Sequence, residues 1–331
     1  MIDVTVVLLD EGLPTTSIAP IEIFSYAGVL WRMLHGQPAE PLFTVRAASL
    51  DGRAPRSQLP ISVQPGSAID DIEKTDLIVV PTAGLDLSRV CERNAALVPW
   101  LRRFRERGAA IAGICTGVSL LAEAGLLEGR PATTHWAIVA ACRQRYPGVH
   151  WQPERFITES DGIYCSGGLY ASIDMSIYLV EKYFGHEVAV QTSKSLLVET
   201  PRTWQAIYSA EPPPRVHGDE RVGKVQRWLY RHFREEVKFD ALAAEVGMSA
   251  RTFNRHFKAA TGETPLEYLH RLRINAAKHL LESERKTVQA VGVDVGYQDA
   301  AYFRQLFKRF TGIGPHAYRE RFGVRRNMPA S

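Results

Sequence analysis

The sequence has few cysteines, and their spacing does not suggest a structural framework. Cys91, Cys115, Cys142 and Cys165 are the only four in 331 residues, and none forms a CxxC pair or has histidines at metal-ligand spacing. This pattern supports neither a zinc site nor a disulfide-stabilised fold. We therefore expect no metal, no cofactor and a reducing compartment.

Long apolar runs and an export signal are also missing. No hydrophobic stretch reaches the roughly 20 residues that a membrane-spanning helix needs. The first residues, MIDVTVVLLDEG, have acids on both sides of a short apolar run, whereas a secretory signal has a basic start and a small-residue cleavage site. We expect a cytoplasmic protein with no membrane partner.

Charge is distributed unevenly along the chain. Residues 215–331 hold 22 Lys and Arg against 13 Asp and Glu, a net charge of +9, and the other 18 against 23 give residues 1–214 a net charge of −5. A basic end of this kind suits an anionic partner such as nucleic acid. The length fits two or three domains.

Two passages of the basic end repeat each other. FNRHFKAATGETPLEYLHR (253–271) and FRQLFKRFTGIGPHAYRER (303–321) share eight identities at an offset of 50 residues. Each predicts a helix with Phe at i and i+4, a Thr-Gly stop and a Pro that cannot continue the helix. A shorter helical pattern ending in Gly precedes each passage, at 239–248 and 287–297. Each copy therefore predicts a helix-turn-helix.

The segment 224–321 resembles the DNA-binding domain of the AraC/XylS family of transcription regulators, most specifically in VGYQDAAYFRQLFKRFTGIGPHAYR. The resemblance implies an all-α domain with two helix-turn-helix units joined by a long helix, and double-stranded promoter DNA as the partner. Gly292 departs from the family pattern, in which Ala is usual. We expect it to weaken its helix by about 1 kcal/mol.

The 100° helical step turns one face of each recognition helix outward, opposite its buried Phe pair. Arg can pair with guanine and Asn with adenine in the major groove, so Arg251, Asn254 and Arg255 are predicted base readers, as are Arg304 and Gln305 in the second unit. Lys258, Lys308 and Arg309 are predicted to contact phosphates. The predicted DNA-facing set is Arg251, Thr252, Asn254, Arg255, Lys258, Asp299, Ala300, Ala301, Arg304, Gln305 and Lys308.

The N-terminal part alternates short β-branched runs with helical patterns. Strands are predicted at 4–9, 43–48, 77–81 and 109–115, and helices at 21–36, 98–108 and 116–127. Such alternation predicts an α/β domain with a mostly parallel sheet covered by helices.

Gly113-Ile114-Cys115-Thr116-Gly117 lies between a predicted strand and a predicted helix. This pattern is typical of a nucleophile elbow, a sharp turn that exposes a strained central side chain. At the start of a helix, we expect the pKa of the Cys115 thiol to be lowered. Together with AGLLEGRPATTHW (124–136), the stretch resembles the ThiJ/PfpI branch of the class I glutamine amidotransferase-like superfamily, over about residues 3–200.

This second resemblance implies a flavodoxin-like, amidotransferase-like sheet and a pocket at the carboxyl ends of its strands. The superfamily's acid and its His after the Cys are replaced by Thr16 and Thr116, so we expect a vestigial elbow and no enzyme. His135 is the remaining candidate base, and Asp174 is interpreted as a helix N-terminal charge. The predicted ligand-binding residues are Thr16, Ala83, Gly84, Cys115, Thr116, His135 and Trp136.

The resemblances divide the chain into a sensor domain at 1–210, a linker at 211–217, a DNA-binding domain at 218–323 and a flexible tail at 324–331. They imply a transcription activator, controlled by an amino acid, a betaine or another amine, that forms a homodimer and contacts RNA polymerase. Three alternatives stay open: a thiol-dependent amidase or hydratase fused to a DNA-binding domain, a redox sensor at Cys115, and a nucleoid-coating protein.

Overall fold

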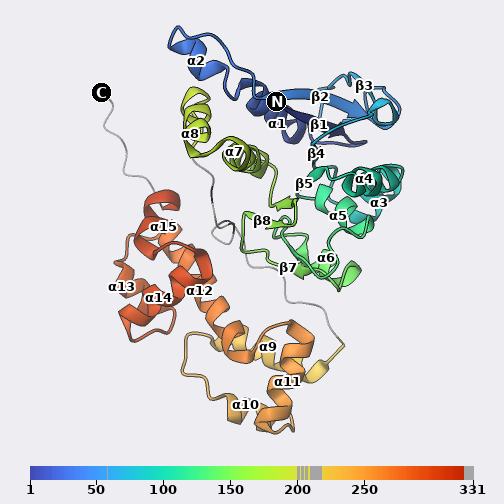
Figure 1. Cartoon of the computed structure of the whole chain (residues 1–331). Helices are drawn as coiled ribbons and strands as arrows, with labels where there is room; N and C mark the ends of the chain where they lie inside the picture. Colours follow the sequence, from blue (N-terminus) through green and yellow to red (C-terminus); the bar gives the residue numbers. More distant parts are fainter. Residues whose placement is uncertain (58, 200–201, 203–204, 206–207, 209–217, 324–331) are drawn as a thin grey trace. The chain divides into compact units, whose positions relative to one another are not determined.

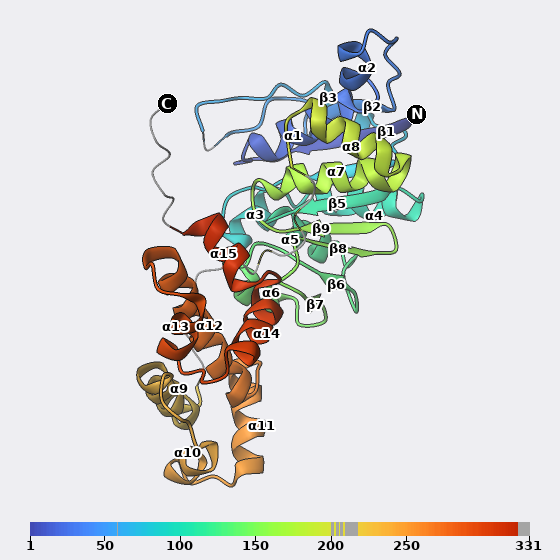
Figure 2. The same cartoon turned by 90° about the vertical axis from the view of Figure 1, so that its left-hand side faces the viewer.

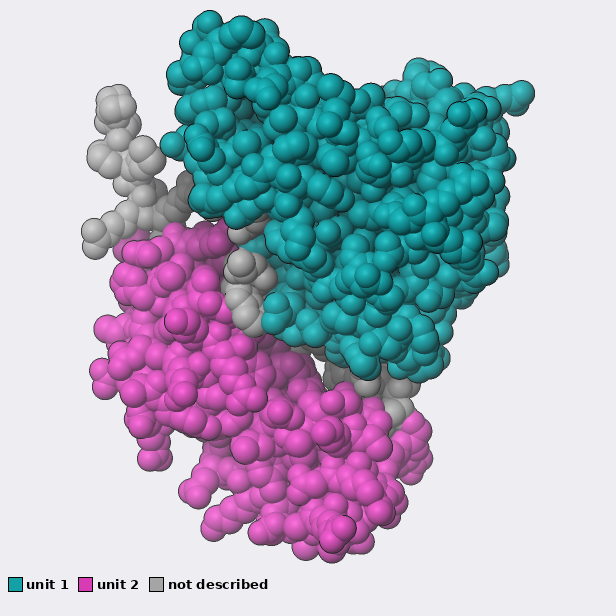
Figure 3. Space-filling view, in the orientation of Figure 1, with its two compact units in different colours: residues 1–205 teal, residues 206–331 magenta. Residues whose placement is uncertain are grey.

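The computed structural model describes residues 1–57, 59–199, 202, 205, 208 and 218–323. The predicted linker and tail lie outside these residues. Contacts divide the chain into two compact units, residues 1–205 and 206–331 (Figure 3).

The first unit contains nine strands and eight α-helices among its described residues. Its elements are β1 (Ile2–Leu8), α1 (Thr15–Tyr26), α2 (Leu30–Leu34), β2 (Phe43–Ser49), β3 (Ser67–Ala68), the 3-10 helix η1 (Ile69–Asp71), β4 (Leu77–Val80), α3 (Leu87–Arg93), α4 (Leu97–Glu106), β5 (Ala110–Ile114), α5 (Gly117–Glu123), β6 (Pro131–Ala132), α6 (Val139–Arg145), β7 (His150–Trp151), β8 (Ile157–Ser160), β9 (Ile163–Ser166), α7 (Ala171–Phe184) and α8 (His186–Ser195).

A seven-stranded sheet in the order β3-β2-β1-β4-β5-β9-β8 forms the centre of this unit. All neighbouring strands are parallel except β8 and β9, which form an antiparallel hairpin at one edge. Helices α1, α7 and α8 cover one face, and α3, α4 and α5 cover the other (Figure 1, Figure 2). The predicted α/β fold with a mostly parallel sheet is confirmed.

The sheet is buried on both faces because alternate residues of a strand point in opposite directions. Val4 and Val6 of β1 pack with α1 and α7, whereas Ile78 and Val80 of β4 pack in the cluster that contains α3, α4 and α5. This explains the unbroken apolar runs in the sequence. In such sheets, ligands bind beyond the carboxyl ends of the strands, where the strand order reverses, here between β1 and β4.

The second unit is helical in all of its described elements. They are α9 (Glu220–His232), α10 (Phe239–Glu245), α11 (Ala250–Thr261), α12 (Pro265–Ser283), α13 (Val288–Asp294), α14 (Ala300–Thr311) and α15 (Pro315–Phe322). Helices α10 and α11 form one helix-turn-helix and α13 and α14 form another, each with its own apolar core.

The sequence repeat is also a repeat of geometry. The ring centroids of Phe253 and Phe257 lie 5.6 Å apart and those of the equivalent Phe303 and Phe307 lie 5.8 Å apart. In both copies the second Phe lies 5.4 Å from the following Tyr, at an interplanar angle of 79°. Both recognition helices end at a left-handed Gly, with φ of +86° and +85°. The predicted pair of helix-turn-helix units is confirmed.

Helix caps follow from the local sequence. The Ser249 hydroxyl accepts from the backbone N–H of Thr252 at the start of α11. Thr264 and Glu267 form a capping box at the start of α12, with Pro265 in its first turn. Helix α12 has 19 residues, a length of about 28 Å at 1.5 Å per residue.

Several predicted helix boundaries are wrong, and the helix expected at 116–127 ends at Glu123. The helix expected at 21–36 is two helices, α1 and α2, because Gly28 turns the chain with φ +76° where a Cβ would lie 2.3 Å from the Glu40 carbonyl oxygen. The spacing of apolar residues over 222–237 predicts a support helix, but α9 ends at His232. Beyond it, the carbonyls of Phe233 and Glu235 accept hydrogen bonds from Arg273 of α12 instead of continuing the helix.

Candidate functional site

Cys115 occupies the turn between β5 and α5. Its φ is +53°, a left-handed conformation that is uncommon for a non-glycine residue and typical of a strained turn. Gly117 allows this turn to approach the end of β4, because a Cβ there would lie 2.3 Å from the Pro81 carbonyl oxygen and 2.4 Å from that of Val80.

The Cys115 side chain is buried rather than exposed. It is 1% exposed, and burial raises the pKa of its thiol to about 11 despite contacts from the backbone N–H of Thr116, the Thr82 hydroxyl and the backbone N–H of His135. The prediction of an exposed thiol with a lowered pKa is therefore wrong. Removing a thiolate from water outweighs the favourable field at the start of α5.

The hydroxyl groups of two threonines accept hydrogen bonds from the backbone N–H groups beside the thiol. The Thr16 hydroxyl donates to the Leu13 carbonyl at 2.8 Å and accepts from the Thr82 N–H at 3.1 Å. The Ala83 N–H donates to the Thr116 hydroxyl at 3.0 Å, and that hydroxyl lies 3.1 Å from the Ala83 carbonyl. Thr16, Ala83 and Thr116 are fully buried. The N–H groups of Thr82 and Ala83 are thus already hydrogen-bonded.

The remaining predicted pocket residues lie nearby. Gly84 is buried and has φ +55°. His135 and Trp136 are half-buried, with ring centroids 5.1 Å apart. His135 Nδ1 accepts from the Ala137 N–H at 3.1 Å, and burial lowers the pKa of the ring, so it is neutral at pH 7. Among the described residues, no hydrogen bond joins this imidazole to the Cys115 thiol.

Ser166 places a buried hydroxyl beside the elbow. It ends β9, and its carbonyl accepts from the Cys115 N–H at 2.9 Å. Its side chain is fully buried, and its hydroxyl has no partner among the described residues. Ser172, at the start of α7, shares both properties. Buried hydroxyls of this kind are available to a ligand or a water molecule.

Sequence reasoning missed two residues near the end of this unit. Arg202 forms an ion pair with Asp174, 2.6 Å between Nη2 and Oδ2, and Gln205 is 2% exposed. Asp174 lies in the first turn of α7, as interpreted from the sequence, and it also accepts from the Arg202 backbone N–H. No local signal could have found these contacts, because they join residues 28 to 72 positions apart.

In the helical unit, the predicted DNA-facing residues lie on the outer faces of α11 and α14, with Asp299 at the N-cap of α14. Thr252 and Ala300 are half-buried, and the others are exposed: Arg251, Asn254, Arg255, Lys258, Asp299, Ala301, Arg304, Gln305 and Lys308.

Three of these side chains already hold a hydrogen bond within the protein. One is the Thr252 hydroxyl, which accepts from the Ser249 hydroxyl at 3.0 Å. Asp299 is the N-cap of α14, where it accepts from the backbone N–H groups of Tyr302 and Ala301, and these bonds lower the pKa of its carboxyl group. Asn254 Nδ2 donates to the Ala250 carbonyl at 2.9 Å. Asp299 therefore has a clear role within the protein.

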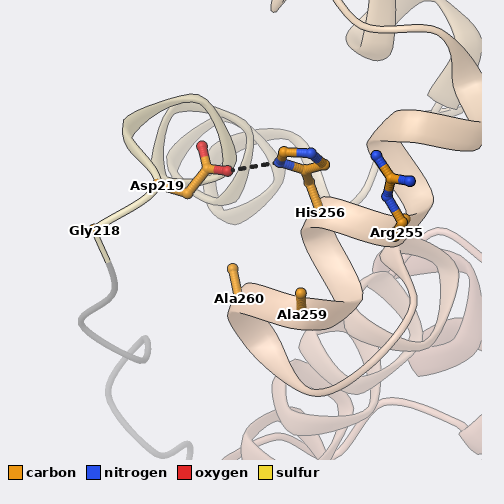
Figure 4. A pocket seen from close by; sticks show the side chains of 6 residues that line it. All are labelled: Gly218, Asp219, Arg255, His256, Ala259 and Ala260. Atoms are coloured by element: carbon orange, nitrogen blue, oxygen red, sulfur yellow. Dashed lines mark hydrogen bonds and ion pairs between the residues drawn. The ribbon is translucent and has the colours of Figure 1, made fainter.

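A surface hollow of about 450 Å³ lies beside α11, and sequence reasoning did not find it (Figure 4). Asp219 caps the start of α9 by accepting from the N–H groups of Arg221 and Val222. It also lies 3.2 Å from Nδ1 of His256 on α11. This contact joins the start of α9 to the recognition helix α11. The lining residues are Gly218, Asp219, Arg255, His256, Ala259 and Ala260.

None of the helices in the described ranges combines the length and apolar character that crossing a bilayer requires. Within the same ranges, no group of three or more His, Cys, Asp or Glu side chains is arranged to hold a metal ion.

Comparison with known proteins identifies both units. A model of the DJ-1/PfpI family matches residues 19–182, and a model of a helix-turn-helix domain matches residues 242–321. The HTH-type transcriptional regulator CdhR of Pseudomonas aeruginosa is 30% identical over 275 residues, covering 83% of this chain and 81% of CdhR. The chain belongs to the AraC-type regulators with a DJ-1/PfpI domain. The family membership predicted from the sequence is thus confirmed.

Another relative agrees with this family, and two solved structures share the α/β fold. The HTH-type transcriptional regulator GlxA of Rhizobium meliloti is 27% identical, covering 67% of this chain and 69% of GlxA. An AraC family transcriptional regulator from Pseudomonas putida is 19% identical with a TM-score of 0.51, covering 59% of this chain and all of that chain. DJ-1beta of Drosophila melanogaster is 18% identical with a TM-score of 0.50, covering 60% and 98%. The two structures show the α/β fold.

Membership of this family makes the helical unit a DNA-binding module. The relatives that match both units of the chain are named as transcriptional regulators. These names agree with a regulatory rather than an enzymatic role for the whole chain.

Proposed function

We propose that the protein is a sequence-specific transcription regulator whose helical unit reads promoter DNA and whose α/β unit binds a small effector. The observation that carries the proposal is the repeated helix-turn-helix geometry, with two recognition helices that expose polar side chains around equivalent buried Phe pairs. Two such helices on one rigid linker can contact two segments of one DNA face.

In the proposed interface, Arg251, Asn254 and Arg255 read bases from α11, and Arg304 and Gln305 read bases from α14. Lys258 and Lys308 bind phosphates. Base contacts carry sequence preference, whereas phosphate contacts carry affinity and its salt dependence. The two kinds of residue therefore have distinguishable roles.

Binding of full-length protein to its own upstream DNA and to scrambled DNA, over a salt series, tests the interface. We expect Arg255→Ala to weaken specific binding by about 1–3 kcal/mol and to reduce discrimination. Lys258→Ala should weaken binding to both DNAs alike. It should also reduce, by about 1, the slope of the logarithm of the binding constant against the logarithm of the salt concentration. Arg103→Ala, which changes an exposed residue of α4 in the other unit, is the charge-matched control. Equal binding to both DNAs by the wild-type protein would support nucleoid coating instead.

The proposed effector site is the carboxyl edge of the sheet around Thr16, Ala83, Gly84, Cys115, Thr116, His135 and Trp136, together with Ser166. We propose binding there without catalysis. Among the described residues no imidazole is hydrogen-bonded to the Cys115 thiol, and a thiol with a pKa of about 11 and no such partner is a poor nucleophile. The backbone N–H groups of Thr82 and Ala83 already donate to the hydroxyls of Thr16 and Thr116, so they are not free to stabilise an oxyanion.

A Cys115→Ala variant separates this proposal from the enzyme and redox alternatives. We expect it to keep the full effector response, measured as the change in promoter binding with a panel of amino acids and amines. Loss of the response with ligand binding intact would favour thiol chemistry. Sedimentation of the same samples tests the proposed homodimer, which would raise the effective concentration of a second DNA-binding unit. Transcription in vitro tests the proposed contact with RNA polymerase.

A further inference from the structure

Gln205 is the last residue of the α/β unit, and its side chain is inserted into that unit. It is 2% exposed, and its backbone N–H donates to the Glu154 carbonyl at 2.8 Å. The side-chain Nε2 donates to the Thr134 carbonyl at 2.7 Å and to the Thr133 hydroxyl oxygen at 3.0 Å. A Cβ at Gly167 would lie 2.5 Å from Gln205 Oε1, so the glycine makes room for the carboxamide.

The two groups that hold this carboxamide can only accept hydrogen bonds from it. The Thr133 hydroxyl donates its own proton to the Arg155 carbonyl at 2.9 Å, and the Thr134 carbonyl has no proton to give. An N–H donor must therefore face them, which fixes the orientation of the Gln205 amide.

The same short stretch supports the elbow. The Thr134 hydroxyl donates to the Cys115 carbonyl at 2.8 Å, and the backbone N–H of the next residue, His135, contacts the Cys115 thiol. The His135 ring lies against Gly168, where a Cβ would be 3.0 Å from its Cδ2. Gln205 thus occupies polar groups that border the proposed effector site.

A second contact holds the chain just before Gln205. Arg202 Nη2 lies 2.6 Å from Oδ2 of Asp174, a carboxylate within a residue that is 5% exposed, and the guanidinium lies 4.5 Å from the centre of the Phe156 ring. This ion pair does not involve Thr133 or Thr134, so it stays in place if Gln205 leaves.

We propose that the Gln205 carboxamide is an internal substitute for the effector, and that an effector with N–H donors, a primary amine or primary amide, displaces it from Thr133 and Thr134. This inference rests on the proposed effector site. A trimethylammonium group has no N–H and would leave both buried acceptors unpaired, which is unfavourable. The site therefore selects N–H-bearing amines over quaternary amines.

Displacement would lengthen the connection to the DNA-binding unit. Tyr208 already packs against the helical unit, with its ring centroid 5.5 Å from that of Phe322. The connection from Gln205 is therefore three residues long (208 − 205), and from Arg202 it is six (208 − 202). Three further residues extend a chain by at most about 10 Å. A longer connection changes the effective concentration of each unit around the other. Binding of the effector would thereby alter DNA binding.

Calorimetry on the full-length protein with matched probes tests this inference: glycine against trimethylglycine, and 4-aminobutyrate against its trimethyl derivative. We expect an N–H probe to bind at least tenfold more tightly than its trimethyl counterpart. Gln205→Met, which keeps the length but removes the N–H donors, should tighten that binding about tenfold because the internal competitor is lost. Gln191→Met, whose wild-type amide bonds Glu187 on α8, is the control and should not change it.

Thr133→Val provides an independent variant if Gln205→Met does not fold, and it should reduce the preference for the N–H probe. Equal or tighter binding of the trimethyl probes, or unchanged affinity in Gln205→Met, would overturn the inference while leaving the effector site intact. Binding of no probe to the wild-type protein or to Gln205→Met would count against the proposed effector site itself, and with it this inference.

Discussion

Two effects of opposite sign act on the thiol of Cys115. The start of α5 and three hydrogen-bond donors favour the thiolate, whereas burial to 1% exposure opposes it and dominates, raising the pKa to about 11. The sequence indicates the first effect, because Cys115 lies between Gly113 and Gly117 just before a predicted helix. It does not contain the second, because burial depends on the packing of Thr82, Thr134 and His135 around the turn.

The raised pKa predicts a slow thiol. At a pKa of about 11, about one Cys115 in 10⁴ is a thiolate at pH 7. We expect iodoacetamide to label Cys115 in the native protein no faster than the buried Cys165, with a rate that rises with pH up to the pKa. Peptide mass spectrometry over a time course measures both rates. Preferential labelling of Cys115 at pH 7 would instead revive the redox alternative.

Lys278 of α12 predicts a pH dependence of stability. The residue is 6% exposed, and burial lowers the pKa of its ammonium to about 8 although Glu282 opposes the shift. The unfolded chain, with a pKa near 10.4, then binds more protons than the folded chain between about pH 8 and pH 10.4. Stability of the helical unit should therefore rise as pH increases through this window.

Urea unfolding of the helical unit at pH 7.5 and pH 9.5, followed by circular dichroism, measures this effect. We expect a higher midpoint at pH 9.5 for the wild type and a smaller rise for Lys278→Met. An equal rise in both proteins would assign the pH dependence to other groups.

At the scale of helices, the repeat fixes each helix-turn-helix, and the side chain of Arg273 contacts both. Arg273 of α12 donates to the carbonyls of Phe233 and Glu235, which follow α9, and lies 5.2 Å from the centre of the Tyr297 ring in the second unit. Gly296, with φ +94°, allows the approach, because a Cβ there would lie 2.7 Å from the Arg234 carbonyl oxygen. The two helix-turn-helix units are therefore held together by direct contacts as well as by helix α12.

Gly292 of α13 affects stability in two opposing ways. The sequence predicts that glycine weakens this helix by about 1 kcal/mol. In the structure, however, a Cβ at this position would lie 2.9 Å from Cδ1 of Phe303, a fully buried ring. We expect Gly292→Ala to lower the free energy of unfolding by about 1 kcal/mol, because overpacking outweighs the gain in propensity.

Gly223→Ala in α9 is the matched control, since the nearest atom to its Cβ is Arg227 Nη1 at 3.5 Å. It should raise the free energy of unfolding by up to about 1 kcal/mol. Denaturant unfolding of both variants measures the difference. Stabilisation by Gly292→Ala would show that Phe303 moves aside without strain.

At the scale of the whole molecule, each unit has its own apolar clusters, two on the faces of the sheet and one in each helix-turn-helix. Separate cores predict separate functions. We expect residues 206–331 alone to prefer the same promoter DNA as the full chain, to bind it more weakly because the proposed dimer is lost, and to ignore every effector. Anisotropy titrations with both proteins measure this, and an effector response by the fragment would contradict the assignment of sensing to the α/β unit.

The sequence by itself determined the family, the two helix-turn-helix units and the parallel α/β architecture. These depend on local periodicity, turn residues and a repeat, all of which are readable along one chain. Only the tertiary structure decided the state of Cys115, the occupied donors of Thr82 and Ala83, and the insertion of Gln205 beside Thr133 and Thr134. Burial and hydrogen bonding between residues about 20 to 70 positions apart arise when the chain folds, and no local pattern encodes them.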